Sequence, residues 1–201
     1  QWCPKSPARQ LWQRRALGAW PPPYTRRFRP WQAPITPFAT SAPSRFAGLA
    51  CITGTSPVVA SRQLRRAADI GLRGAELDVS SLAEPVYHRD WDPLWAASDE
   101  CGIPISFHTV GIEVRTPSDE QMARDYQDEY IGTRTTTVQL DAAEYLASLV
   151  FSGALERHPN MKFVLGESGV GWIPYILARM DMEYDDQFRH LNFSLKPSDY
   201  W

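Results

Sequence analysis

Short apolar runs alternate with helical patterns from about residue 45 onward. Residues 46–53 form an apolar run that ends in a Gly-Thr-Ser-Pro turn, and residues 58–70 place apolar side chains on one side and arginines on the other. Residues 73–79 form a second apolar run, and residues 92–100 form a short helical pattern. A strand followed by a helix, repeated, is typical of βα units in a parallel sheet.

A third strand is predicted at residues 103–108 (IPISFH), which are apolar, β-favouring and preceded by a turn. Residues 138–158 form a long helical pattern that leads into a fourth predicted strand at 161–167. Two of these strands end on His108 and Glu167. Because the chemistry of parallel α/β folds gathers at the carboxyl ends of strands, these two residues are the first candidates for function.

The long polar segment 109–137 interrupts the alternation of strands and helices. It contains an acidic helical pattern at 118–130. A loop of this length inside a domain is usually functional, often as a lid over an active site, and a surface excursion is the alternative. Beyond residue 170 we expect a further helix, and residues 184–201 form a polar tail.

Residues 1–44 show neither a helical nor a strand period. They are rich in proline, arginine and tryptophan, and all 23 acidic residues of the chain lie from Asp69 onward. Prolines break helices and remove backbone donors, so we expect this segment to be disordered or loosely packed. Its composition resembles an out-of-frame or mis-joined translation; a basic nucleic-acid arm and a transit peptide are the alternatives. The chain is therefore divided into residues 1–44 and a folded domain, 45–201.

The composition limits the classes of protein to which the chain can belong. At 201 residues and 43% hydrophobic content, the chain can form one domain with a sizeable core. No apolar run approaches the length of a membrane span, no signal peptide is visible, and no GxGxxG or P-loop motif is present. The three cysteines are widely spaced without a CxxC pair, which favours reduced thiols and a cytoplasmic protein. We expect neither a nucleic-acid nor a membrane partner.

Strand alternation suggests how the two candidate residues meet. His108 shares a face with Ser106, and Glu167 shares a face with Phe163 and Leu165. If both faces point into a barrel, imidazole and carboxylate converge at its mouth, and this pair of groups is a common ligand mixture for zinc and related ions. A satisfied buried histidine is the alternative.

Other polar residues are weaker candidates. Asp78, at the end of its own strand, is a third potential ligand. His88 lies in a loop, and His158 before a proline is expected to close a helix by hydrogen bonding to its last carbonyls. The glycine-rich turn at 166–171 could hold an anion at the start of the following helix.

Five blocks of sequence resemble the amidohydrolase-related family. This branch of the amidohydrolase superfamily includes aminocarboxymuconate-semialdehyde decarboxylase and related aromatic-acid decarboxylases. The resemblance covers residues 43–201 and implies a TIM (β/α)8 barrel with one divalent metal ion, zinc first, that polarises substrate or activates water. The blocks are residues 43–49 (PSRFAGL), 91–97 (WDPLWAA), 104–108 (PISFH), 151–159 (FSGALERHP) and 162–175 (KFVLGESGVGWIPY).

The resemblance also implies roles for individual residues. The family histidine that ends the fifth strand corresponds to His108. The next family histidine, after the sixth strand, is replaced here by Glu167, which is expected to serve as a metal ligand and as the catalytic residue. The first-strand His-x-His pair has no counterpart, because residues 1–44 contain no histidine, and the eighth-strand aspartate is expected beyond Trp201.

The four predicted strands therefore correspond to the third to sixth strands of an incomplete α/β barrel. We expect a fragment of a metal-dependent hydrolase or decarboxylase for a small, carboxylated, cyclic substrate, with weak or absent metal binding and no turnover by the isolated chain. Open barrel edges are expected to favour self-association. A non-catalytic remnant or binding module that retains part of the barrel is the alternative.

Overall fold

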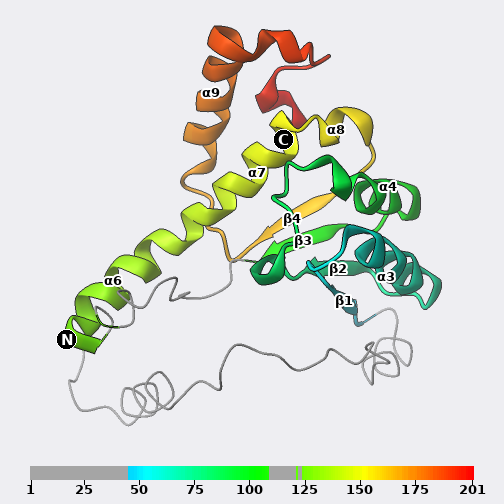
Figure 1. Cartoon of the computed structure of the whole chain (residues 1–201), viewed down its shortest axis with the longest axis horizontal. Helices are drawn as coiled ribbons and strands as arrows, with labels where there is room; N and C mark the ends of the chain where they lie inside the picture. The colour runs from blue at the N-terminus through cyan, green and yellow to red at the C-terminus, as the bar shows by residue number, and fades with distance from the viewer. Residues whose placement is uncertain (1–44, 109–120, 122–123) are drawn as a thin grey trace. The chain divides into compact units, whose positions relative to one another are not determined.

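The computed structural model describes residues 45–108, 121 and 124–201 (Figure 1). The predictions for residues 1–44 and for the first part of the polar segment lie outside the described residues. Within them, four parallel strands form one sheet in the order β1-β2-β3-β4. The strands are β1 (Leu49–Ile52), β2 (Gly74–Leu77), β3 (Ile105–His108) and β4 (Phe163–Gly166).

Helices connect the strands, as the alternating pattern predicts. The α-helices are α3 (Pro57–Asp69), α4 (Asp92–Cys101), α6 (Gln127–Thr137), α7 (Asp141–Phe151), α8 (Ala154–Arg157) and α9 (Ile173–Glu183). Short 3₁₀ turns occupy Val79–Ser81, Arg89–Trp91, Val138–Leu140, Arg189–Leu191 and Pro197–Tyr200, and a π-helical turn occupies Tyr184–Phe188. The helices predicted at 58–70, at 92–100 and beyond 170 are confirmed.

Local sequence explains where α3 begins and ends. The Ser56 side chain accepts a hydrogen bond from the backbone N–H of Val59, and Pro57 occupies the first helical position, where its missing N–H costs nothing. Beyond the helix, Gly71 adopts φ +80°, a left-handed conformation that glycine reaches without steric cost. The chain therefore leaves the helix at Gly71.

One face of the sheet is covered by helices. The strand register places Ile52, Leu77 and Phe107 in one row across three strands, and all three are buried. The Phe107 ring lies 6.1 Å from the Trp95 ring of α4 and 5.5 Å from the Tyr145 ring of α7, measured between centroids. This face therefore forms the hydrophobic core, together with the apolar sides of α3, α4 and α7.

The opposite face is not buried by the described part of the chain. Its central row consists of Cys51, Glu76, Ser106 and Val164, which are all half-buried or exposed. In a (β/α)8 barrel the helices cover the outside of the strands, so this second face corresponds to the barrel interior. The predicted fold class, α/β with consecutive parallel strands of an incomplete barrel, is confirmed.

The helix predicted over 138–158 is interrupted. A 3₁₀ turn precedes α7. The helix is interrupted again between α7 and α8 at Gly153, whose φ is +70°. Arg157 closes this break, because its Nη1 donates to the Ser152 carbonyl over 2.8 Å. The apolar spacing continues across the break, so periodicity alone could not reveal it.

The helical pattern predicted at 118–130 overlaps α6, which covers residues 127–137. The prediction of a polar loop is therefore wrong for the residues after 130. Threonine is a weak helix former, yet Thr135, Thr136 and Thr137 each donate a hydroxyl hydrogen bond to the carbonyl four residues earlier. No residue of α6 is buried. The helix therefore lacks the buried apolar stripe from which a helix is predicted in a sequence. The lid role of this segment stays a prediction.

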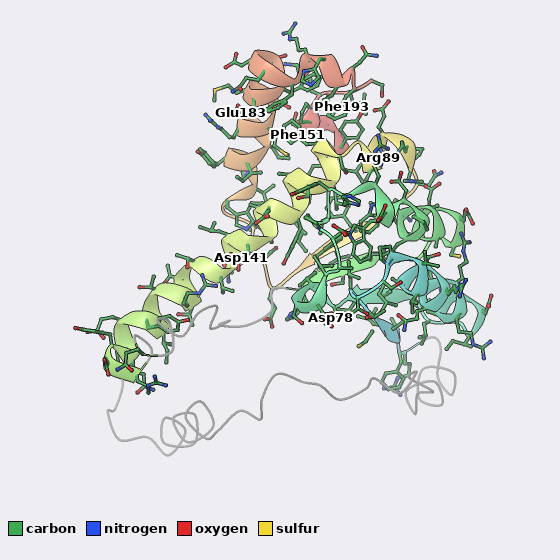
Figure 2. All side chains as sticks on the ribbon, viewed as in Figure 1. Asp78, Arg89, Asp141, Phe151, Glu183 and Phe193 are labelled. Carbon is green, nitrogen blue, oxygen red and sulfur yellow. The ribbon has the colours of Figure 1, made fainter. Side chains whose placement is uncertain are left out.

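The prediction that residues 184–201 form a simple polar tail is also wrong. Pro197 is buried, and Phe193 and Tyr200 pack against the core. Phe193 reaches the end of α7, where its ring would lie 3.6 Å from a Cβ added at Gly153 (Figure 2). The Glu156 carboxylate accepts hydrogen bonds from the Tyr200 hydroxyl and from Ser194. Scattered aromatic residues, rather than a regular period, attach this segment.

Acid is expected to weaken the contact between Glu156 and this C-terminal segment. The Tyr200 hydroxyl, and then Ser194, hold the pKa of Glu156 below its ordinary value of 4.5. A lowered folded-state pKa means that the stabilisation is complete above that ordinary value and is lost as the pH falls through the lowered one. The indole NMR signal of Trp201 should shift in that range. Tyr200→Phe should move the transition to higher pH, whereas the exposed control Tyr87→Phe should leave it unchanged.

Candidate functional site

His108 and Glu167 meet at the carboxyl end of the sheet. His108 is the last residue of β3, and Glu167 directly follows β4. The Nε2 atom of His108 lies 3.7 Å from Oε2 of Glu167, and the two side chains are 39% and 76% exposed. The predicted convergence of the imidazole and the carboxylate is therefore present in the structure.

The reason for this convergence differs from the predicted one. Leu165 is in register with Phe107 on the helix-covered face, whereas Gly166 is in register with His108. Continued alternation would therefore direct Glu167 away from His108, and the predicted grouping of Glu167 with Phe163 and Leu165 does not explain the contact. Instead, Glu167 adopts φ +54°, and this left-handed backbone ends the strand alternation.

A left-handed conformation at a residue other than glycine carries a cost of roughly 1–2 kcal/mol. The glycine-rich turn that follows holds it in place. The buried Ser168 hydroxyl lies 3.1 Å from the carbonyls of Leu165 and Gly169, and the Trp172 indole N–H donates to the Ser168 carbonyl over 2.5 Å. Strained backbone of this kind is found preferentially at functional sites. The anion predicted at this turn stays a prediction.

Asp78, labelled in Figure 2, binds the turn that follows β2. Its Oδ1 accepts hydrogen bonds from the backbone N–H and hydroxyl of Ser80, at 3.1 and 2.5 Å, and its Oδ2 accepts one from the Ser81 hydroxyl at 2.6 Å. Both carboxylate oxygens thus cap the turn after β2. The Cys51 thiol has a raised pKa. Burial is the main cause, and the negative charges of Glu76 and Asp78 add to it.

The described residues fit only part of a metal site. His108 and Glu167 supply a nitrogen and an oxygen of the kind that divalent transition metals and zinc accept. A mononuclear site needs three or four protein ligands. Within residues 45–108, 121 and 124–201, no group of three or more His, Cys, Asp or Glu side chains could hold a metal ion.

His88 and His158 serve the fold. His88 accepts a hydrogen bond from the backbone N–H of Asp90 through Nδ1, at 3.3 Å, and so caps a 3₁₀ turn. His158 ends α8 through its backbone N–H, which donates to the Ala154 carbonyl over 2.9 Å. The expected hydrogen bond to a helix carbonyl is therefore present, and the backbone makes it. The ring itself faces α4, where its Nε2 lies 3.9 Å from Oδ1 of Asp92.

The same Asp92 carboxylate joins α4 to α8, a link that the sequence did not indicate. Oδ1 of Asp92 accepts a hydrogen bond from Nη2 of Arg157 at 2.6 Å. The two residues are 65 positions apart in the sequence. Each lies in one of the blocks that resemble the family, at 91–97 and 151–159, but nothing in those blocks indicates that the two side chains meet. This ion pair stabilises the helical layer and lies outside the His108–Glu167 pair.

The comparisons identify the class of protein. A family model described as Amidohydrolase matches residues 36–192, and the chain therefore belongs to the amidohydrolase family. The predicted family resemblance is confirmed.

No helix in the described part of the chain is both long and apolar enough to span a membrane.

Curated relatives narrow the comparison to decarboxylases. The chain is 29% identical over 150 residues to gamma-resorcylate decarboxylase of Rhodococcus jostii, covering 69% of this chain and 44% of that protein. It is 26% identical over 147 residues to Decarboxylase orsB of Emericella nidulans, covering 69% of this chain and 42% of the relative. The chain thus spans less than half the length of these curated relatives.

Solved structures show the same fold. The 5-carboxyvanillate decarboxylase LigW of Sphingomonas paucimobilis matches with a TM-score of 0.64 at 23% identity, over 82% of this chain and 48% of that one. A dihydroxybenzoic acid decarboxylase of Polaromonas sp., with bound manganese and the inhibitor 2-nitroresorcinol, matches with a TM-score of 0.59 at 23% identity, over 83% and 51%.

Proposed function

We propose that this chain carries part of the active site of a metal-dependent decarboxylase that acts on a carboxylated aromatic acid. The observation that carries the proposal is the contact between His108 and Glu167 at the carboxyl ends of β3 and β4. Imidazole and carboxylate at this end of parallel strands are suited to hold a divalent ion. Family membership supports the same placement.

The names of the relatives favour decarboxylation over hydrolysis. The curated proteins above are decarboxylases, and one solved relative holds manganese together with a nitroresorcinol inhibitor. We therefore propose manganese beside zinc as the metal for this chain. When bound, such an ion polarises the substrate.

The two residues would then have different tasks. His108, half-buried at the end of its strand, would supply a fixed nitrogen ligand. Glu167 is largely exposed, so its carboxylate can contact the ion and also accept or return a proton at Oε2.

A second candidate is a non-catalytic remnant or binding module. The absence of a third candidate ligand near the pair, among the described residues, favours it. Two ligands bind an ion far less tightly than three or four. For the chain as it stands we therefore propose weak, exchangeable metal binding and no turnover.

Calorimetric titration of Zn²⁺ and Mn²⁺ near neutral pH tests this proposal. We expect weak binding by the wild type, no binding by His108→Ala and unchanged binding by the control His158→Ala, whose ring lies beside Asp92. Carbon dioxide release from 2,6-dihydroxybenzoate should not exceed the rate with metal alone. We also propose that the chain self-associates through its open strand edges. Light scattering of the same samples measures this self-association.

The opposite outcomes are distinct. Tight stoichiometric binding by the wild type would show that further ligands join the pair. Equal loss of binding in both variants would remove His108 from the site. Turnover above the metal-only rate would contradict an incomplete site and would show that the chain is itself an active enzyme.

A further inference from the structure

Gly166 lies directly beside the His108 ring. The two residues are in register across β3 and β4, so their side-chain positions point to the same face of the sheet. A Cβ added at Gly166 would lie 3.1 Å from Cδ2 of His108 and 3.5 Å from the Ser106 hydroxyl oxygen. The imidazole ring therefore rests on the β4 backbone, in the space that any other residue would fill with its own side chain.

The backbone of the next residue, Glu167, also affects the contact between His108 and Glu167. Glu167 turns into the left-handed region at φ +54°, and this turn directs its carboxylate to His108 rather than to the helix-covered face. One residue thus leaves room for the ring, and the next delivers the carboxylate. Both features lie at the 3.7 Å contact between Nε2 of His108 and Oε2 of Glu167.

We propose that Gly166 is a positioning residue for the His108–Glu167 pair, because its missing side chain fixes where the imidazole ring lies. The purpose of the pair rests on the function proposed above, whereas the seating of the ring on β4 does not. A purely structural glycine, needed only for packing of the sheet, is the competing explanation.

A double-mutant cycle separates these explanations. In Gly166→Ala the ring must move by a few tenths of an ångström, so the melting temperature should fall. In the His108→Ala background the crowded ring atom is gone, so the same substitution should leave the melting temperature nearly unchanged. Gly171→Ala is the matched control, because an added Cβ there meets nothing within 4 Å, and it should be silent in both backgrounds.

Two further readouts follow the ring itself. The His108 Cδ2–H signal in NMR spectra should shift in Gly166→Ala and stay in place in Gly171→Ala. Where the wild type binds Zn²⁺, affinity should fall by about 10–100-fold in Gly166→Ala, the range typical for groups that orient a metal ligand.

An equal loss of melting temperature in both backgrounds would overturn the proposal, since the glycine would then serve the sheet and not the ring. An unmoved His108 signal in Gly166→Ala would overturn it as well. Failure of the proposed function looks different: the wild type would bind no metal, while the cycle and the ring signal would still report positioning by Gly166.

Discussion

Replacement of Leu77 by alanine is expected to lower the free energy of unfolding by about 2–5 kcal/mol, the range for deleting a buried leucine side chain. Leu77 is 1% exposed and lies in the row that faces the helices. Leu49 offers a matched control, because it is a strand leucine on the opposite face and is 46% exposed. Leu49→Ala should cost less than about 1 kcal/mol.

Urea unfolding of the two variants, monitored by circular dichroism, measures both quantities. The contrast tests the layered architecture as well as the single residues. Equal losses in the two variants would show that the face carrying Leu49 is covered in solution, and would contradict an open barrel interior.

Trp95→Ala is expected to destabilise the chain by about 3–5 kcal/mol. Trp95 is 1% exposed, and its ring centroid lies 6.0 Å from that of Trp91 and 6.1 Å from that of Phe107. The substitution would remove the link between α4 and β3. Because domains of this kind are stable by only about 5–15 kcal/mol, a substantial unfolded population is expected on mild heating.

Thermal unfolding followed by circular dichroism checks this expectation. Trp201→Ala is the control for loss of an indole, since Trp201 is 53% exposed and contacts Phe163 at a centroid distance of 5.8 Å. Its melting temperature should fall much less. A comparable fall would mean that the C-terminal segment is as important to the core as α4.

The strands and the early helices could be predicted because each of them buries one side. This burial sets the pattern of apolar and polar residues along the sequence. The apolar runs of β1 to β4 and the amphipathic spacing of α3 are direct consequences of the helix-covered sheet face. Elements without a buried stripe gave no such signal. The helix α6 has no buried residue, and the C-terminal segment is attached through contacts such as Tyr200 to Glu156, distant in the sequence.

The candidate site was predicted only in part, for a different physical reason. Position at a strand end and family resemblance both indicated His108 and Glu167. Alternation gave the wrong face for Glu167, because it assumes extended backbone and the backbone is left-handed there. The glycines at 166 and 169 were the available signal, since they mark a chain that turns sharply after β4. The role of Asp78 as a turn cap needed the positions of Ser80 and Ser81.

The strand order also has a consequence for the order of folding. Among the described strands, β2, β3 and β4 each pair with the strand before them, so this part of the sheet can grow by one strand at a time as synthesis proceeds. The β3–β4 pairing bridges the longest stretch, from Ile105 to Phe163, and carries the largest loop-closure entropy of the three. Loop closure therefore favours β4 as the last of these four strands to dock. Until it does, Glu167 is not beside His108, and the pair forms only when β4 has docked on β3.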